Sequence, residues 1–151
     1  MPIERYPDED REAAPSTTES PDESLRGSSL LSELAKEMVR IFKEQLGRGP
    51  TSARAAWAGT DVLVIVLEDT LTPAERTLAR MGEHERLRQT RSFFQYASVR
   101  EFCEPVERLT GRTVRAFTSG TDTEVEGLSV ETFVLYPAGT SGAPSRASTQ
   151  H

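Results

Sequence analysis

Four basic side chains recur at four-residue intervals in the middle of the 151-residue chain: Arg76, Arg80, His84 and Arg88. Residues four apart lie on the same face of a helix, so an unbroken helix here would carry a cationic stripe. Such a stripe could bind a small anion, an acidic partner or anionic lipid headgroups. Three glutamates lie among these residues, and the competing interpretation is therefore an ordinary solvated helix face.

A second candidate site is a pair of carboxylates, Glu68 and Asp69, which directly follows the apolar run 62–67. Functional side chains often emerge at the end of a buried strand, so these two residues are a possible pocket. Asp122, Glu124 and Glu126 crowd a single later turn. Neither group has the spacing of a calcium loop or the neighbouring bases of an acid–base site, and solvation of the two turns is the alternative.

Cys103 is the only cysteine, which excludes an intramolecular disulfide and any zinc site built from several cysteines. A nucleophilic pair with His84 would need both groups within hydrogen-bond reach. The two residues lie roughly 28 Å apart along an unbroken helix, so we interpret Cys103 as a core residue. The glycine-rich phosphate loops are also absent. We therefore expect no enzymatic activity, no cofactor and no metal site.

The helices that carry these groups have clear local signals. Ser28 and Ser29 precede an amphipathic segment that reaches Leu46, and Gly47 is a typical helix end. The sequence Thr72-Pro-Ala-Glu75 predicts a capping box with a helix beginning at Pro73. Helical patterning then continues to about residue 110. One straight helix of that length would exceed the size of the domain, so we expect a break at Gly82 or Pro105.

Four strands are predicted, over residues 51–57, 62–67, 113–119 and 128–136. The expected fold class is α+β, with two β-hairpins forming a mostly antiparallel four-stranded sheet covered on one face by helices, in the order α-β-β-α-α-β-β. Parallel pairing between the hairpins remains possible across the long helical connection. Apolar residues on an uncovered sheet face, such as Phe133 and Leu135, would need a partner, so we expect a homodimer.

Charge is distributed unevenly along the chain, whose formal net charge is -6. Residues 1–28 contain eight acidic and three basic residues among Pro, Ser and Thr, which predicts a disordered acidic tail. Residues 29–136 form the predicted single α+β domain, and residues 137–151 a second disordered tail. The domain itself is nearly neutral, which argues against nucleic-acid binding.

Membrane insertion and export are not expected from the sequence. The longest uninterrupted apolar run is Val62–Leu67, whereas a helix that spans a bilayer needs roughly 20 apolar residues. The first ten residues lack the basic start and apolar stretch of a signal peptide. We therefore expect a cytoplasmic protein without a transmembrane segment.

Several motifs in order along the chain resemble the small bacterial MpsC-like family: LGRGP at 46–50, DVLVIVLE at 61–68, LTPAE at 71–75, VERLTG at 106–111 and SGTD at 119–122. The glycine-proline turn and the LTPAE helix start are the most specific of them. The resemblance covers roughly residues 30 to 136. The acidic N-terminal tail and Pro105 depart from the family pattern.

The family takes its name from a sodium-translocating system that generates a membrane potential. The resemblance implies a soluble accessory or regulatory domain that contacts a membrane ion or inorganic-carbon transport protein at the inner face of the membrane. It implies no catalytic residues. The alternative is a regulatory module that binds a small anion or a nucleotide through the arginine stripe or the pocket near Glu68.

Overall fold

The computed structural model describes residues 20–140, and all statements below concern this range. Four strands and four helices follow one another along the chain: α1 (Pro21–Leu46), β1 (Ser52–Trp57), β2 (Val62–Glu68), α2 (Pro73–Arg80), α3 (His84–Ala97), α4 (Val99–Thr110), β3 (Val114–Thr121) and β4 (Ser129–Leu135). The strands form one sheet in the order β1-β2-β4-β3, with every neighbouring pair antiparallel. The predicted α+β class and order are confirmed, and the possible parallel pairing is not found.

Helix α1 begins earlier than the sequence analysis predicted. Ser20 caps it, with its hydroxyl accepting a hydrogen bond from the Glu23 backbone N–H at 3.3 Å and Pro21 at the first helical position. Residues 21–28, which were assigned to the disordered tail, are therefore helical. The rest of that tail, and the second tail beyond residue 140, lie outside the described residues.

The connection between the hairpins contains three helices. Gly82, with φ of 78°, separates α2 from α3, which confirms the first expected break. The second break falls at Ser98, between α3 and α4, and the alternative at Pro105 is wrong because that proline lies inside α4. Pro105 is buried, and its packing offsets the one backbone hydrogen bond that the missing N–H removes.

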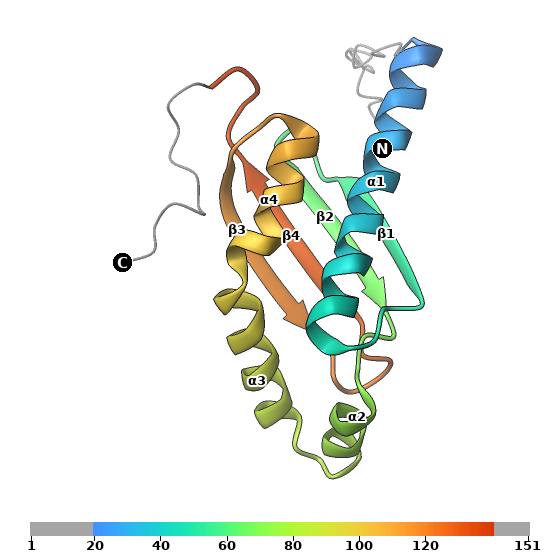
Figure 1. The fold of residues 1–151 in the computed structure, drawn as a ribbon, viewed down its shortest axis with the longest axis vertical. Helices are drawn as coiled ribbons and strands as arrows, with labels where there is room; N and C mark the ends of the chain where they lie inside the picture. The colour runs from blue at the N-terminus through green and yellow to red at the C-terminus, as the bar shows by residue number, and fades with distance from the viewer. Residues whose placement is uncertain (1–19, 141–151) are drawn as a thin grey trace, which may run out of the picture.

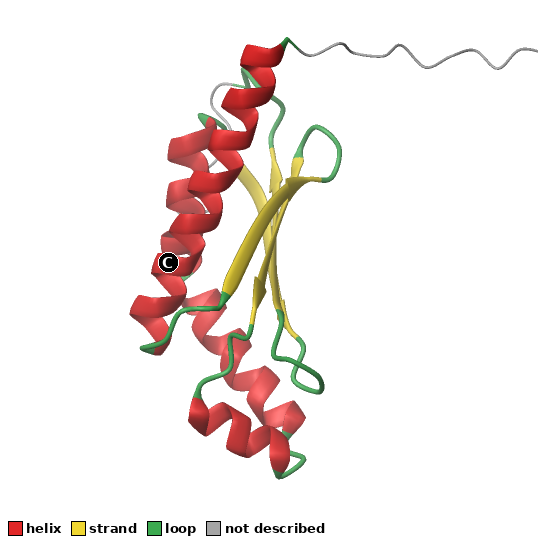
Figure 2. Cartoon of the chain, turned by 90° about the vertical axis from the view of Figure 1, so that its right-hand side faces the viewer, coloured by secondary structure: helices red, strands yellow, loops and turns green. Residues whose placement is uncertain are grey.

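The helices that pack on the sheet lie on one side of it, and no helix of residues 20–140 covers the other side, as Figure 2 shows most clearly. Helices α1 and α4 cover the sheet itself, whereas α2 lies beyond one end of it (Figure 1). The core between the layers joins the inward side chains of the strands to those of α1 and α4, among them Met38, Phe42, Leu63, Ile65, Leu67, Phe102, Val106, Phe117, Phe133 and Leu135. A helix layer on one face of an antiparallel sheet leaves the other face without cover.

The prediction that Phe133 and Leu135 lie on the uncovered face is wrong. Phe133 and Leu135 are fully buried beneath the helices. Side chains alternate along a strand, so Val130, Thr132 and Val134 of β4 occupy the uncovered face instead. The expected homodimer therefore stays a prediction, with different residues available to form it.

Candidate functional site

A fixed turn follows β2 at the end of the sheet. Asp69 adopts a φ of 55°, a left-handed conformation that aspartate reaches more easily than most residues. Its carboxylate pairs with two arginines, with Arg48 at 2.6 Å and with Arg76 of α2. Arg48 also donates hydrogen bonds to the carbonyls of Asp69 and Leu71. These contacts hold the turn, and with it the start of α2, in one geometry.

The loop between β3 and β4 is attached to the same turn. The hydroxyl of Thr70, which is buried, donates a 2.7 Å hydrogen bond to the carbonyl of Gly127. Gly127 has a φ of 66°, and a side chain there would collide with Leu71. Only glycine satisfies both the conformation and the close approach. The β3–β4 loop is therefore held against the end of β2.

The start of α3 holds the other side of this loop. Nδ1 of His84 lies 2.9 Å from Oγ1 of Thr123, and Arg88 donates a 3.2 Å hydrogen bond to the same oxygen. Thr123 is buried in the loop. His84 and Arg88 thus fasten α3 to the loop, which is a structural role for two of the predicted stripe residues.

A cleft of about 660 Å³ opens between α2, the end of β2 and the β3–β4 loop. Five of the six predicted site residues line it: Glu68, Asp69, Arg76, Arg80 and His84. Arg88 does not line it. The predicted stripe and the predicted carboxylate pocket, which the sequence analysis treated as separate sites, are brought together here. The break at Gly82 divides the stripe between two helices, so it does not form one continuous helix face.

The charges in the cleft are mixed and differ in how far they are paired. Arg76 is already paired with Asp69, and Glu68 lies 3.5 Å from Arg54 on the neighbouring strand. Arg80 is exposed and, among residues 20–140, hydrogen-bonds only to the Thr77 hydroxyl. Glu124 and Glu126 lie across the cleft in the β3–β4 loop. Arg80, with His84 beside it, is the cation most available to a ligand.

A buried ion pair that the sequence did not predict lies behind the cleft. Arg91 of α3 is 2 % exposed and forms a two-point ion pair with Glu75 of α2, with Nε–Oε2 and Nη2–Oε1 distances of 2.6 and 2.9 Å. Arg91 also donates to the backbone carbonyl of Thr70. Burial alone would raise the pKa of Glu75, but the hydrogen bonds from Arg91 and Thr72 outweigh it and leave that pKa below its ordinary value.

Glu131 lies deeper in the same region, on the helix-covered face of β4. It is fully buried, with one carboxylate oxygen 3.4 Å from Nε2 of Gln95 and the other without a hydrogen-bond partner in the described structure. Burial raises the pKa of Glu131 to about 7. The signal that could have identified it is strand alternation, since Glu131 has the same parity as Phe133 and Leu135.

Within residues 20–140, no three His, Cys, Asp or Glu side chains are grouped so that they could hold a metal ion. Cys103 is fully buried in the core beside Phe102 and Val106. What the site provides is a cleft of fixed shape with charges of both signs.

No helix in the described part of the chain is long and apolar enough to cross a membrane. Fold and site together define an α+β domain with a one-sided helical layer and a cleft at the end of its sheet.

Residues 27–136 match the family model described as Na+-translocating membrane potential-generating system (MpsC), and the chain belongs to this family. The resemblance noted from its motifs is thereby confirmed. Searches of curated proteins and of solved structures gave no match.

Proposed function

We propose that this protein is a non-enzymatic accessory or regulatory domain of a membrane ion or inorganic-carbon transport system, which it joins by protein–protein contact at the cytoplasmic face of the membrane. The observation that carries the proposal is the match of residues 27–136 to a family described by a membrane-potential-generating system. A domain with this role needs a surface that a protein partner covers.

Helix α3 offers such a surface. Its buried face contains Arg91 and Gln95, whereas Phe93 is 71 % exposed and Phe94 and Tyr96 are exposed as well. A helix that only packs on its own domain normally turns its apolar side chains inward. Exposed aromatic side chains on one helix are typical of protein contact sites. We assign the contact with the transport system to the aromatic face of α3, defined by Phe93, Phe94 and Tyr96.

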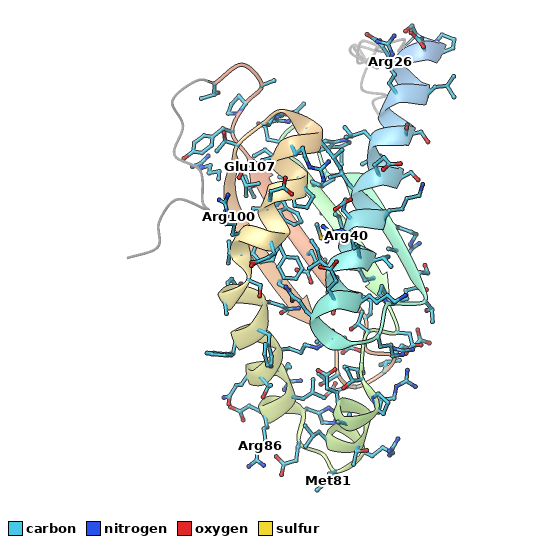
Figure 3. All side chains as sticks on the ribbon, viewed as in Figure 1. Arg26, Arg40, Met81, Arg86, Arg100 and Glu107 are labelled. Atoms are coloured by element: carbon cyan, nitrogen blue, oxygen red, sulfur yellow. The ribbon has the colours of Figure 1, made fainter. Side chains whose placement is uncertain are left out.

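This contact is tested by replacing Phe93 with serine in the full chain and measuring how much protein co-purifies with membranes of the organism that makes it. Leu25 provides a matched control because its side chain is also 71 % exposed. Arg26, its neighbour, lies at the opposite end of the molecule from Met81 and Arg86 of the α2–α3 end (Figure 3). We expect Phe93→Ser to lose most of the membrane-bound fraction and Leu25→Ser to keep it, with unchanged melting temperatures. Equal recovery of both variants would contradict the assignment.

The second candidate function is binding of a small anion in the cleft, which the exposed guanidinium of Arg80 beside His84 favours. Phosphate or bicarbonate at about 100 times its dissociation constant is then expected to stabilise the protein by about 2.7 kcal/mol. Arg80→Gln should abolish this thermal shift. Arg26→Gln is the control, because Arg26 is an exposed arginine on α1. An absent shift, or the same shift in both variants, would exclude this function.

A further inference from the structure

The uncovered face of the sheet is apolar at its centre. Its two central strands contribute five valines and one threonine, all half-buried: Val62, Val64, Val66, Val130, Thr132 and Val134. No helix within residues 20–140 lies on this side of the sheet (Figure 2). β-Branched side chains with few rotamers present a pre-ordered surface, so covering them costs little conformational entropy.

Apart from Arg54 and Arg115, the edge strands of this face carry small side chains. The register places Ala56 of β1 beside Val64, and Ala116, Thr118 and Gly120 of β3 beside Val134, Thr132 and Val130. Two sheets pack face to face at about 10 Å when the side chains between them are small enough to interdigitate. This face therefore permits a second sheet to approach across its whole width.

Four charged residues lie around the margins of the face. Glu68 ends β2 with the same parity as Val66, and the exposed Arg115 lies at the β3 bulge over the Tyr136 ring. The other two are Arg54 and Asp122.

Arg54 of β1 is paired with Val66 in the register and is exposed. Val66 pairs with Val130, and Val130 pairs with Gly120 of β3, so Gly120 lies in the same cross-strand row as Arg54 at the opposite edge of the sheet. No atom lies within 4 Å of the position that a side chain at Gly120 would take. Asp122 follows just beyond the end of β3, on the uncovered side by alternation, and is exposed.

We propose that the uncovered face binds a second copy of this chain, with a two-fold axis parallel to the strands and between β2 and β4. This axis places β2 of one copy over β4 of the other, so that Val62 and Val66 lie over Val134 and Val130, and Val64 lies over Thr132. It also places β1 of one copy over β3 of the other. Arg54 then lies over the open space at Gly120 of the other copy and reaches Asp122 of that copy. Symmetry forms each contact twice.

The two halves of the face are thus complementary to each other in size and in charge, which is the condition for an interface that one surface forms with itself. The proposal goes beyond the accessory role and does not depend on it. The aromatic face of α3 belongs to the helix layer, and it stays accessible when the opposite face of the sheet is covered.

The first test is the molar mass of the full chain by light scattering over a wide range of protein concentration. We expect twice the 16.7 kDa of one chain. Val64→Arg places a charge at the centre of the face and should raise the dissociation constant of the dimer by about two orders of magnitude. The control, Thr90→Arg on the exposed side of α3, should leave it unchanged. A wild-type monomer at every concentration, or a dimer that Val64→Arg does not weaken, would overturn the proposal.

Exchange of the marginal charges provides a second test that does not disturb the apolar centre. Arg54→Asp and Asp122→Arg should each weaken the dimer roughly tenfold, since each removes two symmetric ion pairs. The double variant should recover most of the wild-type affinity. The contact of Arg54 with Glu68 in its own chain cannot produce this recovery. A double variant that is weaker than both single variants would overturn the two-fold arrangement.

Discussion

Replacing Arg91 by methionine is expected to lower the free energy of unfolding by about 3–5 kcal/mol. The guanidinium is 2 % exposed and satisfies both the Glu75 carboxylate and the backbone carbonyl of Thr70. Methionine keeps the contact with Phe42, whose ring lies 5.9 Å from the guanidinium, but leaves a mostly buried carboxylate without its cation.

The double variant Glu75→Gln/Arg91→Met separates the loss of the pair from the cost of the unpaired charge. It should recover part of the lost stability, because an unpaired neutral amide is cheaper to bury than a carboxylate. Arg86→Met, an exposed change on the same helix, should stay within about 0.5 kcal/mol of wild type. Urea unfolding measures all three variants. An Arg91→Met protein as stable as the Arg86→Met protein would show that the buried pair does not hold α3 in place.

Replacing Glu131 by glutamine is expected to make the protein more stable above pH 7, with little effect at low pH. The pKa of Glu131 is raised from 4.5 to about 7 in the folded protein. Below about pH 4.5 the carboxyl is protonated in both the folded and the unfolded protein, and its ionisation costs no stability. As pH rises from there through 7, the unfolded state is favoured because its carboxyl ionises more easily, and stability is lost. The difference between the two pKa values corresponds to roughly 3 kcal/mol. Glutamine stays neutral and escapes this loss.

The measurement is the free energy of unfolding of wild type and Glu131→Gln between pH 4 and pH 8.5. Other ionisable groups affect both proteins alike, so the difference between the two curves isolates Glu131. We expect that difference to grow in favour of the variant between about pH 4.5 and pH 7 and to level off above pH 7. A difference that does not change with pH would contradict a protonated, buried Glu131. Gln95 and Arg91 are the polar groups of α3 that face it, so loosening of α3 at high pH should accompany the loss.

Local signals in the sequence predict most of the fold. The main error, the late start predicted for α1, arose because one such signal was given too little weight. Thr72 and Glu75 were identified as a capping box, and the structure places α2 where they predict. Ser20 and Glu23 form the same motif around Pro21, but the acidic, Pro- and Ser-rich composition of residues 1–28 outweighed it. Ser98 ends α3 without glycine or proline, so no local pattern marked that break.

The candidate site was only partly predictable because its residues meet through long-range contacts. Arg80 and Glu68 were chosen separately, and their convergence depends on the turn at Asp69 and on the attachment of Thr70 to Gly127. Neither contact leaves a periodic signal. Strand alternation could have predicted the burial of Glu131, because Glu131 lies on the same face of β4 as Phe133. Since Phe133 was expected on the uncovered face, Glu131 was not recognised as buried.

The central claim is that this domain serves a membrane transport system through the aromatic face of α3. The most direct test measures the sodium-dependent membrane potential in cells that lack the protein and in cells that regain wild type, Phe93→Ser or Leu25→Ser. We expect the loss of the protein to lower this potential, and wild type and Leu25→Ser to restore it, whereas Phe93→Ser does not. An unchanged potential without the protein, or full restoration by Phe93→Ser, would contradict the claim.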